Sequence, residues 1–360
     1  MTKRVLFLLK EYKADGGIER VSRNLANEFL AQDLVVFFHL LQGAELQDPR
    51  LGSTFKVTHT EADSSALKRI RQMLALIKRE QIDTIIAATE TANIAALICK
   101  CCYPQLKIVF TRHCAFDVSG QNLSPRQIKL LYCLYVCFGK VVAVSKALQK
   151  ELIKTVPLFK NRIAYLANPS VVKEMKQLAQ QTIEGWTREN YFVAIGRLEQ
   201  QKGFDLLLQA YALALKANAQ LPLLVVVGDG SQKNQLLTLS KTLNIDHAVV
   251  FTGFVPNPYY ILSKACCFVL SSRHEGMPTV LIEALSLNIP SIAFACPTGP
   301  AEIIQHKVNG YLLNNGDIHA LSQAMLSYDE LPCENLEQSV SQFHSEQAAR
   351  AYLTLIGGEH

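Results

Sequence analysis

Short apolar segments alternate with helical patterns along the chain, and this alternation limits the possible folds more than any other feature. Segments such as residues 223–227 are apolar on both faces, as in parallel strands covered by helices. The alternation occurs twice over, which predicts an α/β protein with two doubly wound, Rossmann-like domains. The expected strands lie near residues 4–9, 35–41, 56–60, 83–88, 107–112, 140–145 and 162–167, and then near 191–197, 222–228, 248–253, 267–272, 290–295 and 310–313.

A polar segment at residues 169–190 lacks strand signals and is expected to link the two domains. The first domain then covers residues 1–168 and the second residues 190–333. Residues 334–360 carry a helical pattern near 334–356, which we expect to cross back to the first domain. A chain of 360 residues, 49% of them hydrophobic, is long enough to give each domain its own core.

Membrane spans, signal peptides and disulfides are not indicated. No apolar run reaches the roughly 18 to 20 residues of a transmembrane helix, and the apolar start is interrupted too early for a signal peptide. The ten cysteines are spread along the chain, so we expect reduced thiols and a cytosolic protein. Cys99 and Cys102 have a CxxC spacing, but Cys101 intervenes and no histidine pair is near, which argues against a metal or redox site.

Positive charge is concentrated in the first half of the chain. Residues 1–170 contain 24 Lys and Arg against 14 Asp and Glu, a net charge of +10, whereas the remainder contains 12 against 17, a net charge of −5. Residues 67–79 form a basic amphipathic helix candidate. Residues 129–150 place further lysines around an apolar run at 130–138.

Two interpretations of these basic segments stay open. Both segments can rest on an anionic membrane surface, where lysines and arginines near the lipid add binding energy. Alternatively, both are helices that pack on the sheet with solvated outer faces. The charge asymmetry between the halves favours membrane contact for the domain as a whole. Nucleic acid fits less well, because no recognised binding motif accompanies the cations.

The segment from Glu275 to Glu283 places two carboxylates across a loop-to-helix junction. Pro278 suits the first turn of a helix, and Gly276 lets the backbone approach a ligand. Glu283 lies about one turn into that helix, where it can accept hydrogen bonds from ribose hydroxyls, while Glu275 can bind a hexose. The alternative is a pair of ordinary surface glutamates, because short motifs have many false positives.

A second motif lies some eighty residues upstream. Residues 193–198 read as a buried strand that ends in a turn at Gly196, and residues 201–205 open the next helix. This arrangement places Arg197 and Lys202 at the carboxyl end of a parallel strand, where open α/β sheets bind ligands. Two cations there suit a pyrophosphate. For either residue alone, a solvated loop cation is the favoured interpretation, because exposed Arg and Lys are common.

These motifs together resemble family 4 of the retaining glycosyltransferases. The resemblance rests on Gly-Arg-Leu followed by Lys-Gly, and on residues 226–230, 252–254, 271–278 and 299–304 in the same order. The first half agrees more loosely, at residues 16–20, 113 and 142–146. The resemblance implies the two-domain GT-B fold, with a cleft that faces the carboxyl ends of both sheets. It also implies a first domain that binds the acceptor and a second that binds a nucleotide sugar.

The resemblance also implies roles for individual residues. Arg197 and Lys202 would neutralise the leaving diphosphate, Glu275 would hydrogen-bond the donor sugar, and Glu283 would hydrogen-bond the ribose. The rest of the expected donor site consists of Gly196, Phe254, Val255, Gly276, Met277, Pro278 and Thr279, of which Phe254 and Val255 flank the base.

The first domain contributes fewer candidates. Gly16 and Gly17 would let the backbone approach the diphosphate at a helix N-terminus, although a plain strand-to-helix turn also uses glycines. His113 ends an expected strand and would bind the 6-position of the sugar or the acceptor. Arg112 and Asp117 are further candidates. We expect His274 to shape its loop and Ser145 to cap a helix.

These observations predict a cytosolic, peripherally membrane-bound glycosyltransferase on the cytoplasmic face of the inner membrane. No Asp-x-Asp sequence is present to hold a metal-bound diphosphate, so we expect no metal and no cofactor. The resemblance implies retention at the anomeric carbon. It also implies a UDP-hexose or UDP-N-acetylhexosamine donor, and a glycan or lipid-linked acceptor in lipopolysaccharide, capsule or related surface-polysaccharide synthesis.

Two alternatives share the architecture. A sugar-nucleotide 2-epimerase is less consistent with the sequence, because such enzymes carry extra acidic and histidine groups in another motif order. A non-catalytic subunit that binds a sugar nucleotide is less consistent with the complete set of Arg197, Lys202, Glu275 and Glu283.

Overall fold

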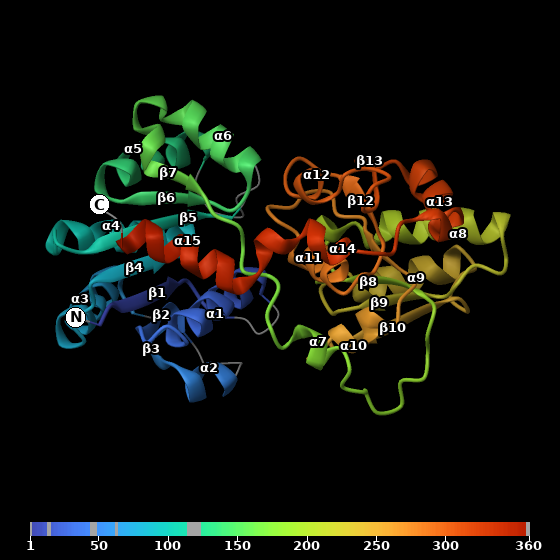
Figure 1. Cartoon of the computed structure of the whole chain (residues 1–360), viewed down its shortest axis with the longest axis horizontal. Coiled ribbons are helices and arrows are strands. Elements are labelled where there is room, and N and C mark those ends of the chain that lie inside the picture. Colours follow the sequence, from blue (N-terminus) through green and yellow to red (C-terminus); the bar gives the residue numbers. More distant parts are fainter. Residues whose placement is uncertain (1, 13–15, 44–48, 62–63, 114–123, 358–360) are drawn as a thin grey trace. The chain divides into compact units, whose positions relative to one another are not determined.

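The computed structural model describes residues 2–12, 16–43, 49–61, 64–113 and 124–357. The chain forms two compact units (Figure 1). The first unit combines residues 1–169 with residues 345–360, and the second is the continuous segment 170–344.

The first unit is built on a parallel sheet of seven strands. Their order is β3-β2-β1-β4-β5-β6-β7, so the chain moves outward on one side of β1 and then on the other. Strand β4 is fully buried, as expected for a central strand with helices on both faces. The strands are β1 Arg4–Leu9, β2 Val35–Gly43, β3 Lys56–Glu61, β4 Thr84–Ala87, β5 Lys107–Arg112, β6 Lys140–Ala143 and β7 Ile163–Tyr165.

Hydroxyl side chains define where several helices of the first unit begin. Ser65, Thr89, Ser124 and Ser145 each accept a hydrogen bond from the backbone N–H three residues later. The expectation that Ser145 caps a helix is therefore confirmed. The helices are α1 Gly17–Leu30, α2 Pro49–Thr54, α3 Ala66–Arg79, α4 Glu90–Cys102, α5 Pro125–Phe138, α6 Lys146–Thr155, the 3₁₀ helix η2 Pro157–Arg162, and α15 Ser345–Gly357.

Helix α15 completes the core of the first unit, although it follows the second unit in sequence. It packs against α1, and Figure 1 shows it as the red helix over the first sheet. Its inner face, Ala349, Tyr352 and Ile356, belongs to the same buried cluster as Phe7 and Phe38. Those two rings stack with centroids 5.1 Å apart.

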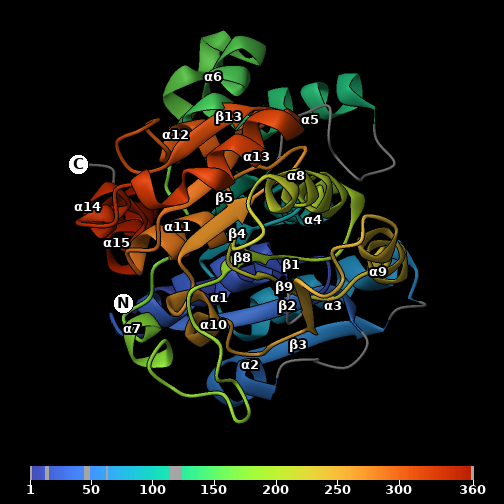
Figure 2. The ribbon, with the colours of Figure 1, turned by 90° about the vertical axis from the view of Figure 1, so that its right-hand side faces the viewer.

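The second unit is built on a parallel sheet of six strands in the order β10-β9-β8-β11-β12-β13. The strands are β8 Phe192–Ile195, β9 Leu224–Val227, β10 Val249–Gly253, β11 Cys267–Leu270, β12 Ser291–Ala295 and β13 Tyr311–Asn314. Helices α8 and α13 pack against each other beside this sheet (Figure 2). The helices are α7 Met175–Leu178, η3 Gln200–Lys202, α8 Phe204–Ala217, α9 Lys233–Thr242, α10 Tyr259–Ser263, α11 Thr279–Ser286, α12 Pro300–Ile303, α13 Ile318–Leu326, η4 Tyr328–Glu330, α14 Leu336–Ser339 and η5 Ser341–Phe343.

Both sheets confirm the doubly wound architecture predicted from the sequence. A strand forms at each expected place, and all pairings between named strands are parallel. The winding reverses between β1 and β4 in the first sheet and between β8 and β11 in the second. Open α/β sheets bind ligands at the carboxyl ends of the strands that flank such a reversal.

Residues 334–356 differ from the continuous helical pattern that we expected. They form α14, η5 and α15 in succession, and Asn335 has a left-handed backbone with φ 58°. Between η5 and α15, His344 is extended and forms a β-bridge with Val171, and the Phe343 carbonyl accepts hydrogen bonds from the N–H groups of Ser170 and Val171. In the expected linker, Met175 of α7 is buried and contacts Ser286.

Within the described ranges, no helix is both long and apolar enough to cross a membrane.

Candidate active site

The best-defined polar cluster lies in the second unit, where the winding of the sheet reverses. Strand β8 ends at Ile195, and its loop continues through Gly196 and Arg197 to Lys202. Strand β11 ends at Leu270, and its loop leads to Glu275. These two strands are neighbours in the sheet although about seventy residues separate them. The two motifs predicted from the sequence therefore meet at the ligand-binding edge of the fold.

Lys202 and Glu275 form an ion pair at this edge. Lys202 Nζ lies 2.6 Å from Glu275 Oε1, and the side chains are 20% and 7% exposed. Ser272 Oγ donates to the same carboxylate oxygen at 2.7 Å. The Thr298 hydroxyl donates to the carbonyl oxygen of Glu275. The carboxylate is thus held from several sides, while part of the ammonium stays accessible to a ligand.

A second ion pair joins the same two loops. The Arg273 guanidinium binds Asp205 with both of its terminal nitrogens and also donates to the carbonyl of Gln200. These hydrogen bonds hold the pKa of Asp205 below its usual value. Gln201 Nε2 donates to the backbone carbonyl of His274 at 3.0 Å, which joins the two loops at a further point.

Glycines allow the close approach of these loops. Gly203 has φ +64°, and a Cβ there would collide with the Ser271 carbonyl. Gly228 has φ +139°, and a Cβ there would collide with the Gly196 carbonyl. At Gly203 the Ser271 carbonyl leaves no room for a Cβ, so the Lys-Gly sequence at 202–203 has a steric cause.

Helix α11 begins at Thr279. We expected Pro278 inside the first turn, but it is the N-cap residue. Gly299 packs closely against the start of this helix. A Cβ at Gly299 would lie 2.6 Å from Pro278 Cδ and 3.0 Å from the Gly276 carbonyl oxygen. Met277 is buried, and the Glu283 side chain is only 1% exposed. The structure thus places Glu283 inside the unit rather than on its surface.

The remaining predicted donor residues share the carboxyl edge of the second sheet. Gly196 N–H donates to the Val227 carbonyl, and Gly228 N–H donates to the Gly253 carbonyl, so the ends of β8, β9 and β10 lie side by side. Arg197 is exposed. Phe254 is 53% exposed directly after β10, and Val255 is half-buried. An exposed aromatic ring at this position suits stacking against a base.

In the first unit, Gly16 and Gly17 lie where helix α1 begins. Gly16 is the N-cap with an extended backbone, and α1 starts at Gly17. The Glu19 carboxylate folds back against the Gly16 Cα, where a Cβ would collide with it. A Cβ at Gly17 would meet no neighbouring atom within 4 Å. The Glu19 carboxylate is the mobile end of a flexible side chain and can move away, so sterics do not require glycine at position 16 or at position 17.

His113 follows strand β5, and its tautomer can be derived from its neighbours. Thr111 Oγ1 donates its only proton to the Ala87 carbonyl at 2.7 Å. The same oxygen lies 3.0 Å from His113 Nε2, so it must accept a hydrogen bond from that nitrogen. The other ring nitrogen, Nδ1, is then the acceptor. Burial and the Arg112 charge lower the pKa of His113 to about 4, so the ring is neutral at pH 7.

Arg112, which we expected to be a further binding residue, is buried instead. Its guanidinium is 2% exposed and pairs with Glu90 at 2.7 Å. Tyr132 also donates to this carboxylate, at 2.6 Å. Arg112 is the last residue of β5 and His113 follows it, and their side chains contact different neighbours, Glu90 and Thr111. Asp117, the other additional candidate, lies outside the described residues.

The described residues hold no cluster of three or more His, Cys, Asp or Glu side chains that could bind a metal ion. Nine cysteines within those ranges are free thiols. In the CxxC pair, Cys99 is buried and Cys102 is exposed. Burial, reinforced by Cys102, raises the pKa of Cys99 to about 12.

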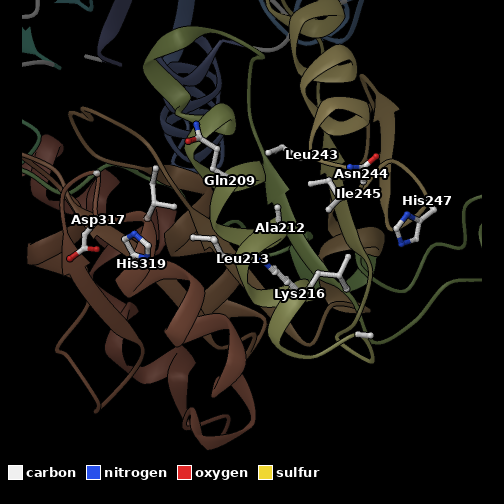
Figure 3. A pocket seen from close by; sticks show the side chains of 14 residues that line it. Gln209, Ala212, Leu213, Lys216, Leu243, Asn244, Ile245, His247, Asp317 and His319 are labelled. Carbon is white, nitrogen blue, oxygen red and sulfur yellow. The ribbon is translucent and has the colours of Figure 1, made fainter.

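A cavity of about 870 Å³ lies elsewhere in the second unit, around helix α8. Figure 3 shows Asp317 and His319 on one side of this helix and Asn244 and His247 on the other. None of the residues that we predicted for the donor site lines it. The ion pairs Lys202–Glu275 and Arg273–Asp205 lie instead in the loops at the strand ends.

We did not predict roles for Ser272, Arg273, Asp205 or Thr298. Ser272, Arg273 and Asp205 lie inside motifs that we had singled out, but Arg273 and Asp205 are 68 residues apart in the sequence. Ser272 and Thr298 contact Glu275, which lies 3 and 23 residues from them. The strand order of a doubly wound sheet could have predicted the contact between Arg273 and Asp205, because the first and fourth strands of such a domain are neighbours.

Two family models match successive parts of the chain. Residues 15–169 match Glycosyltransferase Family 4, and residues 176–343 match Glycosyl transferases group 1. The chain belongs to family 4 of the glycosyltransferases. The resemblance noted from its motifs is confirmed, and with it the assignment as a transferase.

Individual relatives agree. An uncharacterized glycosyltransferase of Methanocaldococcus jannaschii is 30% identical over 258 residues, or 68% of this chain and 63% of that protein. A lipopolysaccharide 1,6-galactosyltransferase of Escherichia coli is 30% identical over 219 residues, or 59% of each chain. The chain thus matches less than two thirds of the length of either relative.

The solved structure of the Anabaena protein HepE in complex with UDP superposes with a TM-score of 0.72 at 20% identity. The superposition covers 98% of this chain and 95% of that protein. At this identity the match establishes the fold. The glycosyltransferase therefore has the GT-B fold, with the two parallel, doubly wound domains described above.

Proposed function

We propose that this glycosyltransferase moves a hexose or N-acetylhexosamine from a UDP-sugar to a glycan or lipid-linked acceptor, with retention at the anomeric carbon. The product would belong to lipopolysaccharide, capsule or a related surface polysaccharide. The observation that carries the proposal is the Lys202–Glu275 ion pair at the winding reversal of the second sheet. The lipopolysaccharide galactosyltransferase relative supports the product class, and the UDP-bound HepE structure supports the donor.

In the proposed reaction, the bond between the anomeric carbon and the diphosphate breaks and a bond to the acceptor oxygen forms on the same face. The acceptor proton passes to a phosphate oxygen of the leaving group. Negative charge grows on that group in the transition state, where Arg197 and Lys202 would stabilise it. Glu275 would accept hydrogen bonds from the donor sugar, and its contact with Lys202 keeps both groups in place before the donor binds.

The remaining residues complete the proposed donor site. Glu283 would hydrogen-bond the ribose through a rearrangement that exposes its buried carboxylate. The loop at Gly276, together with Met277, Pro278 and Thr279, would present backbone groups to the sugar and the diphosphate. Gly16 and Gly17 would contribute backbone N–H groups at the start of α1. His113 Nδ1 would accept a hydrogen bond from a sugar hydroxyl.

We also propose that the reaction needs no metal ion and no cofactor. Two cations at the carboxyl edge of the second sheet, Arg197 and Lys202, can balance much of the charge of a leaving diphosphate. We expect sugar transfer to continue when a chelator removes metal ions. The basic first domain would attach the enzyme to the cytoplasmic face of an anionic inner membrane, where a lipid-linked acceptor is available.

The test of the donor site is protection from thermal unfolding by UDP-, GDP- and ADP-sugars without added metal. Saturation at about 100 times the dissociation constant should stabilise the protein by about 2.7 kcal/mol. We expect protection by UDP-sugars only, and its loss in Lys202→Ala. The matched control is Lys264→Ala, which breaks the exposed ion pair with Glu189 elsewhere in the second unit. Undiminished protection of the Lys202 variant would contradict the assigned site.

A further inference from the structure

Helix α5 of the first unit is apolar on its outer face as well as on its inner face. The inner residues Ile128, Tyr132, Tyr135 and Val136 are buried in the unit. On the outside, Leu130, Leu134 and Phe138 are 66%, 42% and 39% exposed. Cys133 and Cys137, one turn apart on the same outer stripe, are exposed as well. A surface helix normally carries polar residues on this face, so the stripe indicates a binding partner.

The 3₁₀ helix η2 extends this apolar surface. Leu158 is 92% exposed and Phe159 is 39% exposed. Helix α5 leads into β6 and η2 leads into β7, and these strands pair with Val141 opposite Ile163. The C-terminal end of α5 and η2 therefore lie together at the amino edge of the sheet, beside α6 (Figure 1). We define the α5–η2 surface as Leu130, Cys133, Leu134, Cys137, Phe138, Leu158 and Phe159.

Cations far outnumber acidic residues in the segment that carries the α5–η2 surface. Residues 124–162 contain eight Lys and Arg against a single acidic residue, Glu151. Lys129 and Lys154 line a shallow cavity of about 550 Å³ next to Leu130. Lys160 in η2 is exposed. Exposed apolar side chains accompanied by lysines and arginines match the chemistry of a bilayer surface with anionic headgroups.

We propose that the α5–η2 surface docks the enzyme on an anionic lipid bilayer. The apolar side chains enter the boundary between headgroups and acyl chains, and the cations of the same segment pair with lipid phosphates. This inference rests on the membrane attachment proposed above and assigns it to one surface.

The structure also distinguishes this surface from the other basic segment, helix α3. On α3, Met73, Leu76 and Ile77 are buried, and Leu67 is its exposed large apolar residue, at 61%. An isolated leucine is ordinary on a protein surface, whereas the α5–η2 surface groups five large apolar residues. Helix α3 thus follows the alternative interpretation, a helix that packs on the sheet with a solvated outer face.

The native cysteines provide the first test on the unmodified chain. Cys133 and Cys137 lie in the α5–η2 surface, whereas Cys101 and Cys102 on α4 and Cys333 in the second unit are exposed elsewhere. Alkylation rates of all five are measured by mass spectrometry with and without phosphatidylglycerol vesicles. We expect vesicles to slow alkylation of Cys133 and Cys137 about tenfold and to leave the other three unchanged. Neutral phosphatidylcholine vesicles should protect much less.

Flotation with the same vesicles provides the second test. We expect the double variant Leu130→Asp/Leu158→Asp to lose vesicle binding and the control variant Leu67→Asp on α3 to keep it. Protection by UDP-sugars from thermal unfolding should be unchanged in both variants, which separates the membrane surface from the donor site and shows that the variants fold.

Four outcomes would overturn the inference. Equal protection of all five cysteines would mean that vesicles shield the protein without using this surface. Protection of Cys133 and Cys137 that depends on protein concentration and needs no vesicles would show that a second copy of the chain covers the surface. Vesicle binding that persists in the double variant would show that the protein attaches to membranes through another surface. No vesicle binding by the native chain would exclude membrane attachment altogether.

Discussion

Arg273 and Asp205 form a two-pronged ion pair, with Nη1–Oδ1 and Nη2–Oδ2 distances of 2.8 and 2.7 Å. The pair ties the start of helix α8 to the loop after β11, and these two segments carry Lys202 and Glu275. Both side chains are about one third exposed, so the pair itself adds little to stability, typically about 0 to 1 kcal/mol. Its importance is geometric, because it fixes one loop relative to the other.

We therefore predict that Arg273→Lys impairs catalysis more than folding. A lysine keeps the charge but cannot bind both carboxylate oxygens. A misplacement of about 1 Å can cost about 100-fold in rate, so kcat/KM should fall by about 10- to 100-fold while Tm changes by only a few degrees. Steady-state kinetics and calorimetry on the same samples check this. An unchanged kcat/KM would show that the loops keep their positions without the pair.

Removal of either member of the Lys202–Glu275 pair should reduce transfer. We expect Lys202→Ala and Glu275→Gln each to lower kcat by about 100-fold or more, because each removes a group aimed at the reacting part of the donor. The measurement is transfer at saturating donor. Lys264→Ala is the matched control and should retain activity. Near-normal turnover in Glu275→Gln would contradict the role of that carboxylate in binding the donor sugar.

Gly203→Ala should destabilise the second unit more than Gly185→Ala. Both glycines have positive φ, +64° and +75°. A Cβ at Gly185 meets no atom within 4 Å, whereas at Gly203 it collides with the Ser271 carbonyl. The backbone strain, about 1 kcal/mol, is therefore common to both, and overpacking adds about 1 to 3 kcal/mol at Gly203 only. Urea unfolding measures both variants, and equal losses would refute the steric explanation.

His113 should act as a neutral group. Its pKa of about 4 in the folded protein lies below the value of 6.5 expected when it is exposed. The unfolded chain therefore binds the proton more tightly, so His113 adds stability above pH 6.5 that is lost as the pH falls towards 4. His113→Ala should lower kcat/KM by about tenfold, the effect of one hydrogen bond. The pH–rate profile between 6 and 8 should keep its shape in this variant, and a changed shape would contradict the neutral tautomer.

Glu90→Gln should strongly destabilise the first unit. The substitution leaves the Arg112 charge buried without its carboxylate, a change that typically costs about 3 to 5 kcal/mol. Denaturant unfolding provides the measurement. Glu189→Gln, in the exposed pair with Lys264, is the control and should cost less than about 1 kcal/mol. A similar small loss in both variants would show that the buried pair is compensated by other contacts.

The strands were predictable from the sequence because their residues are apolar on both faces, as in the fully buried Leu224–Val227. The same reasoning failed at residues 334–356. Leu336, Val340 and Phe343 recur at helical spacing, but they are buried on short separate elements after the positive φ of Asn335. Periodicity reports which residues face a core, and it does not report whether the chain between them turns.

The candidate residues were likewise easier to predict than their contacts. Lys202 and Glu275 were identified separately, and their ion pair depends on β8 and β11 being neighbours. The bond between Thr111 and His113 had a local signal, because residues two apart on a strand share a side. We expected Arg112 to be a binding residue, and its buried pairing with Glu90 is apparent only from the fold.

The position of α15 in the sequence affects the order in which the domains mature on the ribosome. Ala349, Tyr352 and Ile356 fill part of the core of the first unit, yet they are synthesised after the whole of the second unit. Domains usually fold in the order of their synthesis, the N-terminal one first. Here the second unit is a single uninterrupted segment that is available earlier, so the nascent first domain must wait for its closing helix with part of its apolar interior uncovered.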